Sequence, residues 1–204
     1  MLKPLARGLT LIELMVGLVI LAMLLALGTP AFTTWMANAR IRSTAEATLA
    51  GLQLTRSEAS NRNAFVRFQL TTSLESDCEL STTGPNWVVD IATTDADDSV
   101  ASRCNLPADD TSPPHLLHKR AAAGALGSTL VTSTVNSLVF NGLGRLRNGP
   151  ANGARIDITG PDPANCRPLG ELNCLRLEIS AAGQVRLCNP VFSSGTAQAC
   201  LMPI

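Results

Sequence analysis

Six cysteines are the residues with the plainest chemistry in this chain of 204 residues. They follow one another at intervals of 26, 62, 8, 14 and 12 residues, and no Cys-x-x-Cys pair occurs, so their spacing fits no zinc-ligand pattern. An even number of cysteines downstream of an export-like apolar segment is typical of disulfides formed in an oxidising compartment. Many pairings are open, and sequence proximity favours Cys78–Cys104, Cys166–Cys174 and Cys188–Cys200.

The other side chains that could do chemistry are sparse. His115 and His118 are three residues apart, but a Pro-Pro pair precedes them, so we expect two loop histidines and no metal site. The carboxylate pairs Asp97-Asp98 and Asp109-Asp110 fall in a polar stretch where we expect nothing to shift a pKa. The sequence contains no nucleophile, phosphate-loop, zinc-protease or EF-hand motif. It therefore predicts a protein that is not an enzyme and holds no cofactor or metal.

One carboxylate stands inside an apolar run. Residues 9–28 are apolar except for Thr10 and Glu13, and a helix of that length spans about 30 Å, the thickness of a bilayer core. An ionised glutamate there costs a few kcal/mol. A signal peptide cut near residues 26–28 and a plain membrane anchor both leave this cost unexplained. Cleavage after Gly8 would free an ammonium on Leu9, one helical turn from Glu13 or within reach of Glu13 in a neighbouring chain.

Gly8 and the residues after it, Leu-Thr-Leu-Ile-Glu-Leu, resemble the prepilin processing motif of type IV pilins and type II secretion pseudopilins. In those families a membrane peptidase cuts after the glycine and methylates the new amine, usually that of a phenylalanine. The resemblance implies prepilin peptidase cleavage after Gly8 and methylation of Leu9. It also implies that Glu13 and a helix-kinking Pro30 act in assembly with other pilins. The chain would then reside in the bacterial inner membrane, with its head in the periplasm, before it enters a pilus or pseudopilus.

A long helix must position these residues. From residue 30 to residue 62 the apolar residues share one helical face, and helix-forming residues run out near residues 61–63. We expect a helix from Leu9 to Arg62 that is bent at Pro30. Residues 1–8 would be a leader, 9–29 a transmembrane half and 30–62 an amphipathic half. The shared face consists of Ile41, Ala45, Leu49, Leu52 and Ala59.

After residue 63 the apolar period changes to two, which indicates β-strands. The polar stretch at residues 93–114 predicts a long loop. A helix followed by strands without crossover helices predicts an α+β fold, in which the long N-terminal helix packs on an antiparallel sheet in a head at residues 63–204. With the motif, this implies a pilin-like lollipop. The expected strands are residues 65–70, 87–91, 137–140, 154–158, 174–180 and 184–188.

A second resemblance covers much of the head. Parts of the helix, of the strand near Trp87 and of residues 139–145 and 179–188 resemble FimT and FimU minor pilins and GspH pseudopilins. It implies a low-copy subunit near the tip of a filament. Three functions stay open: a minor pilin acting in pilus assembly or the tip complex for motility, adhesion or uptake, a DNA-binding minor pilin for natural transformation, or a type II secretion pseudopilin of the GspH type.

DNA binding rests on four arginines. FimT-like proteins of natural transformation share a Gly-Arg-x-Arg stretch near the C-terminal end. Here Gly-Arg-Leu-Arg occurs at residues 144–147, in the middle of the head, whereas residues 183–186 read Gly-Gln-Val-Arg. If these arginines line one edge they would pair with phosphates; otherwise they are ordinary solvated residues. The four are Arg145, Arg147, Arg155 and Arg186.

Overall fold

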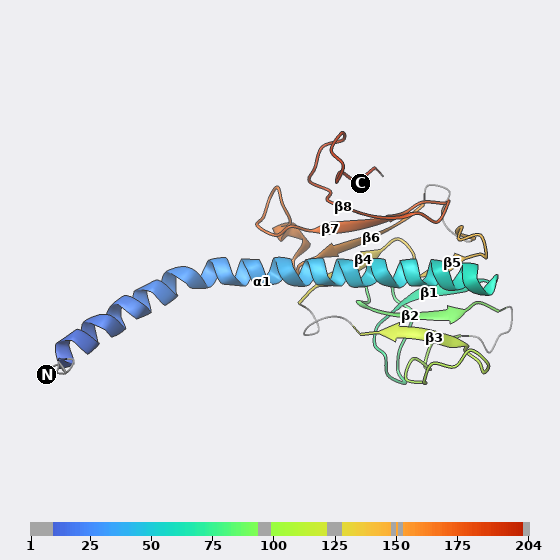
Figure 1. The fold of residues 1–204 in the computed structure, drawn as a ribbon, viewed down its shortest axis with the longest axis horizontal. Helices are drawn as coiled ribbons and strands as arrows, with labels where there is room; N and C mark the ends of the chain where they lie inside the picture. The colour runs from blue at the N-terminus through green and yellow to red at the C-terminus, as the bar shows by residue number, and fades with distance from the viewer. Residues whose placement is uncertain (1–9, 94–98, 122–127, 148–149, 151–152, 202–204) are drawn as a thin grey trace, which may run out of the picture. The chain divides into compact units, whose positions relative to one another are not determined.

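The computed structural model describes residues 10–93, 99–121, 128–147, 150 and 153–201, although not the side chains of residues 26–31. By its internal contacts the chain divides into two compact units, Met1–Met36 and Ala37–Ile204. A single helix, α1, runs from Leu11 to Arg62 (Figure 1). Its C-terminal end is where the sequence predicted it.

The N-terminal unit contains the first part of α1. No helix in the described part of the chain is both long enough and apolar enough to cross a membrane. The predicted transmembrane half, residues 9–29, extends at both ends beyond the side chains that the structure describes. Those boundaries therefore stay a prediction, as does a bend at Pro30, whose side chain lies outside the described residues.

The head contains two four-stranded antiparallel sheets, which confirms the α+β class. The first sheet has the strand order β3-β2-β1-β5 and the second has the order β4-β6-β7-β8. The strands are β1 (Val66–Thr71), β2 (Asn86–Ile91), β3 (Leu116–Arg120), β4 (Leu130–Ser133), β5 (Ser137–Phe140), β6 (Ala154–Thr159), β7 (Leu175–Ile179) and β8 (Val185–Cys188). All six expected strands are present.

Two strands, β3 and β4, were not predicted from the sequence. β3 has two apolar residues followed by three polar ones, and its pairing with β2 shifts register between Val89 and Asp90. β4 is four residues long. Neither stretch shows the alternation from which a strand can be predicted. The prediction of two loop histidines was therefore wrong for His118, which lies on β3.

Both sheets pack on the C-terminal part of α1. Figure 1 shows strands of the two sheets on either side of this helix, and one buried cluster joins the three elements. The predicted helical face is buried except at Leu49, which is half-buried. Gly51 allows the close approach, because a Cβ there would lie 2.8 Å from the Trp87 ring. Other members of this core include Phe68, Phe140, Ile156, Ile158, Leu177 and Ile179.

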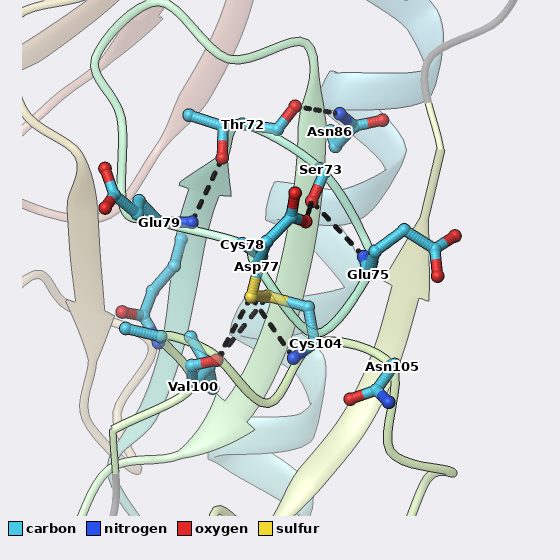
Figure 2. The surroundings of a disulfide bond; sticks show 12 residues. Thr72, Ser73, Glu75, Asp77, Cys78, Glu79, Asn86, Val100, Cys104 and Asn105 are labelled. Atoms are coloured by element: carbon cyan, nitrogen blue, oxygen red, sulfur yellow. Dashed lines mark hydrogen bonds between the residues drawn. A yellow bond between two sulfur atoms is a disulfide. The ribbon is translucent and has the colours of Figure 1, made fainter.

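A second, smaller core lies beside the long loops and contains the first disulfide (Figure 2). Cys104 donates its N–H to the Cys78 sulfur at 3.2 Å. The Lys119 ammonium donates to the carbonyls of residues 104, 105 and 106 at 2.9, 3.1 and 2.9 Å, which holds the loop against β3. The disulfides are Cys78–Cys104, Cys166–Cys174 and Cys188–Cys200, the pairing that sequence proximity favours.

Candidate functional site

The predicted processing site, Gly8 and Leu9, lies outside the described residues. Glu13 lies in the first turn of α1, where its N–H donates to the Thr10 hydroxyl at 3.3 Å. A carboxylate in this turn is favourable, because the N-terminal N–H groups of a helix carry partial positive charge. The Glu13 side chain is exposed in the single chain.

The apolar residues around Glu13 are exposed as well. Every described side chain from Leu11 to Leu25 is exposed, with fractions of 78% at Leu11 and 53% at Ile20. Glu13 is the one ionisable residue in that stretch. An apolar surface of this extent needs cover from lipid or from other protein.

Two of the four arginines lie on one face of the second sheet. Arg155 on β6 pairs in register with Glu178 on β7, which pairs in turn with Arg186 on β8. The next pair on the same face of β6 and β7 is Asp157 with Arg176, whose guanidinium donates to the Asp157 carboxylate at 2.5 Å. We call these five residues the charge ladder. Because opposite charges alternate across its strands, each arginine has a carboxylate as a cross-strand or along-strand neighbour.

The C-terminal segment, residues 189–201, is held on this ladder. The Arg186 guanidinium donates to the carbonyls of Ala197 and Ala199 at 2.7 and 2.8 Å. The Glu178 carboxylate accepts the N–H of Leu201 at 3.0 Å. Glu178 also lies near the sulfurs of Cys188 and Cys200. These two cysteines form a disulfide, so they offer no thiolate to a metal.

The other two arginines lie in the turn after β5, beside the first sheet. Arg147 places its guanidinium carbon 4.1 Å from the centroid of the Phe65 ring and donates its N–H to Val139 at 2.8 Å. The Arg145 side chain is exposed. The structure therefore divides the four predicted residues between two sheets.

The Gly-Arg-Leu-Arg stretch at residues 144–147 nevertheless contacts the Gly-Gln-Val-Arg stretch at residues 183–186 through two glycines. A Cβ built on Gly183, in the turn between β7 and β8, would lie 1.9 Å from the Gly144 carbonyl oxygen and 3.1 Å from the Arg145 Cα. Both glycines have positive φ, 69° at Gly144 and 80° at Gly183. The sequence did not predict this junction, and its signal there is limited to two glycines that each precede an arginine within three residues.

The chain's two histidines lie near the C-terminal end of α1. His118 Nε2 is 3.7 Å from the Glu58 carboxylate, which also accepts from Arg62 at 2.7 Å. His115 Nδ1 is 3.1 Å from the Asp110 carbonyl. The contact of His118 connects β3 to the helix, and an ion pair of 2.8 Å between Arg62 and Asp110 connects the preceding loop to it. In the described part of the chain the two histidines belong to no ligand set for a metal.

Asp109 corrects one expectation about the loop carboxylates. Its side chain accepts from the Thr111 hydroxyl at 2.6 Å and from the Thr111 N–H at 2.8 Å. The hydroxyl of Thr111, then its N–H, and then Ser112 lower the pKa of Asp109 well below its usual value. The prediction that nothing in this loop shifts a pKa was therefore wrong. Asp97 and Asp98 lie outside the described residues.

Comparison with known proteins identifies two segments. Residues 44–183 match the family described as type II transport protein GspH, and residues 4–29 match the prokaryotic N-terminal methylation motif. No curated protein sequence matches the chain.

Among solved structures, the chain is similar to the type IV minor pilin FimU of Pseudomonas aeruginosa in two crystal forms. The match to the first crystal form has a TM-score of 0.47 at 19% identity, and it covers 72% of this chain and 87% of the FimU chain. The match to the second has a TM-score of 0.46 at 19% identity, and it covers 72% of this chain and 90% of the FimU chain.

Proposed function

The chain belongs to the GspH family and carries a prepilin methylation motif, and from this premise we propose that it is a minor pilin incorporated into a type IV pilus. Family and motif together make it a pilin-like subunit of a type IV pilus or a type II secretion system, a structural protein rather than an enzyme. The motif implies processing by prepilin peptidase and assembly with other pilins, first in the inner membrane and then in the filament.

The exposed apolar helix around Glu13 carries the proposal. Helices that expose apolar residues on all sides are covered either by lipid or by other helices. In a filament the helices of neighbouring subunits supply that cover. The one carboxylate then sits in an apolar interior, where an unpaired charge is costly. A methylated Leu9 amine from a neighbouring subunit would neutralise Glu13 and set the axial register between subunits.

The test replaces Glu13 with alanine and with glutamine in the native host. Both variants should be cleaved and retained in the inner membrane like the wild type, while their share in sheared filaments falls about tenfold, which corresponds to 1.4 kcal/mol. Leu14→Ala, next along the same helix, is the matched control and should assemble. Wild-type incorporation of Glu13→Ala would refute the register role.

Mass analysis of the mature N-terminus tests processing separately. The proposal requires a methylated Leu9 as the first residue. An intact Met1, or a start at Thr29, would contradict it. Deletion of the gene distinguishes the filament: loss of surface pili supports the pilus, whereas loss of exoprotein release with pili intact supports a type II secretion pseudopilin.

DNA capture for natural transformation is a second candidate, favoured by the contact between Gly144 and Gly183. It brings Arg145 beside the turn where Gln184 replaces the first arginine of the Gly-Arg-x-Arg pattern. Arg145 is exposed and would supply the missing cation from the turn after β5. Arg186 and Arg147 contribute less, because the first is bonded to backbone carbonyls and the second stacks on Phe65.

A further inference from the structure

The two sheets of the head have four edge strands, and the chain itself bonds to three of them. β5 accepts the Arg147 N–H at Val139 at 2.8 Å, and β3 accepts the Asp109 N–H at Leu116 at 2.8 Å. On β4, Ser133 donates its N–H to Thr82 at 2.7 Å. Such cover is the usual way in which proteins prevent open edges from pairing with other chains.

β8, the fourth edge, has no such bond at its own residues in the described part of the chain, and the C-terminal segment pairs with the next residue, Asn189. Ser180 donates to the Gln184 carbonyl at 2.9 Å, which identifies a bonded pair of the β7–β8 ladder. Because bonded and non-bonded pairs alternate in antiparallel ladders, Arg186 and Cys188 bond to β7, whereas Val185 and Leu187 direct their N–H and C=O groups away from it.

Asn189 confirms this alternation. By the same alternation its backbone N–H and C=O groups should point away from β7. Its N–H does donate to the Gln198 carbonyl at 2.8 Å, in a parallel bridge with Ala199. The C-terminal segment therefore pairs with the edge at Asn189. In the described residues, no backbone group bonds to Val185 or Leu187 on that side.

The side chains of β8 define what kind of strand fits. Val185 and Leu187 are half-buried and pack against the main core, while Arg186 points to the opposite face of the sheet. A strand added at this edge would place apolar residues beside Val185 and Leu187. It would place one residue directly opposite Arg186, whose guanidinium keeps its charge while it donates to the carbonyls of Ala197 and Ala199. A carboxylate is favourable at that position and a cation is not.

Charge and register argue against a second copy of this chain as that strand. Antiparallel pairing of two β8 strands through Val185 and Leu187 would set Arg186 opposite Arg186 of the other copy, and like charges in that position are destabilising. A register centred on Leu187 would need the outward N–H of Asn189, which is already bonded to Gln198.

We propose that β8 accepts an extended apolar–acidic–apolar segment from a different filament subunit, which adds a fifth strand to the second sheet. Backbone hydrogen bonds at Val185 and Leu187 would supply affinity, and the acidic residue opposite Arg186 would supply specificity. The identity of the partner as a filament subunit rests on the proposed function, whereas the strand chemistry does not.

The test uses the full-length, disulfide-bonded chain in detergent micelles and two capped peptides, Thr-Val-Glu-Val-Thr and Thr-Val-Lys-Val-Thr. Amide hydrogen exchange is followed by NMR. The glutamate peptide should slow exchange at Val185 and Leu187 and bind about fivefold more tightly than the lysine peptide. The outward amide of Ser133 on β4, already bonded to Thr82, serves as the internal control and should not respond.

Two variants test the charge. R186E should reverse the preference between the peptides, and R186Q should abolish it, while Cys188–Cys200 keeps the C-terminal segment attached in both. Equal binding of the two peptides to wild type and R186E would overturn the proposal. So would unchanged exchange at Val185 and Leu187 at millimolar peptide, or self-association of the free chain through β8.

These outcomes are distinct from failure of the proposed function. A chain that is processed at Gly8 and enters filaments, yet does not bind the peptides, would refute the strand site alone. A chain that binds the peptides but is not cleaved at Gly8 would refute the pilin proposal alone.

Discussion

Gly183 lies directly against Gly144, so that the turn between β7 and β8 contacts the turn after β5. Gly144 in turn lies on α1, since a Cβ there would be 2.8 Å from Arg56 Nε. Two turns, one beside each sheet, thus meet at the helix, and a Cβ at Gly183 would overlap the backbone of the other turn. The contact connects the two sheets beyond their shared core.

Gly183→Ala should therefore destabilise the head by more than its backbone conformation alone requires. A positive φ costs a non-glycine residue about 1–2 kcal/mol, and the added Cβ would also clash with a carbonyl oxygen, so we expect a loss of more than about 2 kcal/mol. Gly195→Ala is the control, because its φ is 114° but nothing lies within 4 Å. Urea unfolding measures both, and equal losses would show that the contact contributes nothing.

Asp109 should titrate well below an ordinary aspartate. Its pKa is lowered by hydrogen bonds that the carboxylate accepts, so their stabilisation is present above the usual aspartate pKa of about 4 and is lost as pH falls through the folded value. Thr111→Val removes the hydroxyl that lowers the pKa of Asp109 most, so the pKa should rise. Thr111→Ser keeps a hydroxyl, so the pKa of Asp109 should stay low. Carboxyl chemical shifts across a pH series measure this, and identical titrations of the two variants would contradict it.

Arg67 should stabilise the folded head, because it pairs with the buried carboxylate of Asp90. The Asp90 carboxylate is fully buried and accepts from the Arg67 guanidinium, at 3.0 Å from Nε, and from the Gln69 amide at 2.7 Å. Arg67→Met should cost about 3 kcal/mol of unfolding free energy, because it weakens compensation of a buried charge. The double variant Arg67→Met/Asp90→Leu should recover part of that loss. Additive losses in a double-mutant cycle would argue against coupling.

DNA binding, if the second candidate is right, should depend on Arg145. Full-length chain in detergent is titrated with duplex DNA over a salt series. Arg145→Ala should lower the affinity and reduce the slope of log K against log salt by about 1. Arg42→Ala, an exposed arginine paired with Glu46 on α1, should change neither quantity. Absent or salt-independent binding by the wild type would exclude this function.

Local patterns predicted much of the fold. The helix ended where helix formers ran out, and each strand with clear alternation formed, because these signals depend on a few neighbouring residues. β3 and β4 lack that pattern. β3 exists because its backbone pairs with β2 despite a shift of register, with Leu116 and Leu117 buried in different clusters. Such pairing is a long-range property.

The candidate sites divide in the same way. The processing motif is contiguous, so the sequence alone indicated Gly8, Leu9 and Glu13, and the methylation motif matches there. The four arginines are scattered along the chain, and which residues each of them contacts depends on the register of the strands. Arg155 and Arg186 became parts of a ladder with Glu178, and Arg145 came to lie beside Gly183.

The sequence by itself determined a long helix, whose first part is apolar with one carboxylate, joined to a β-rich head that contains all six cysteines. Composition, period and contiguous motif require no knowledge of distant contacts. Only the tertiary structure decided which arginines are already bonded, that two glycine turns meet, and that β8 keeps an open edge. Those features depend on how strands far apart in sequence align, and a one-residue change of register would move every side chain to the other face.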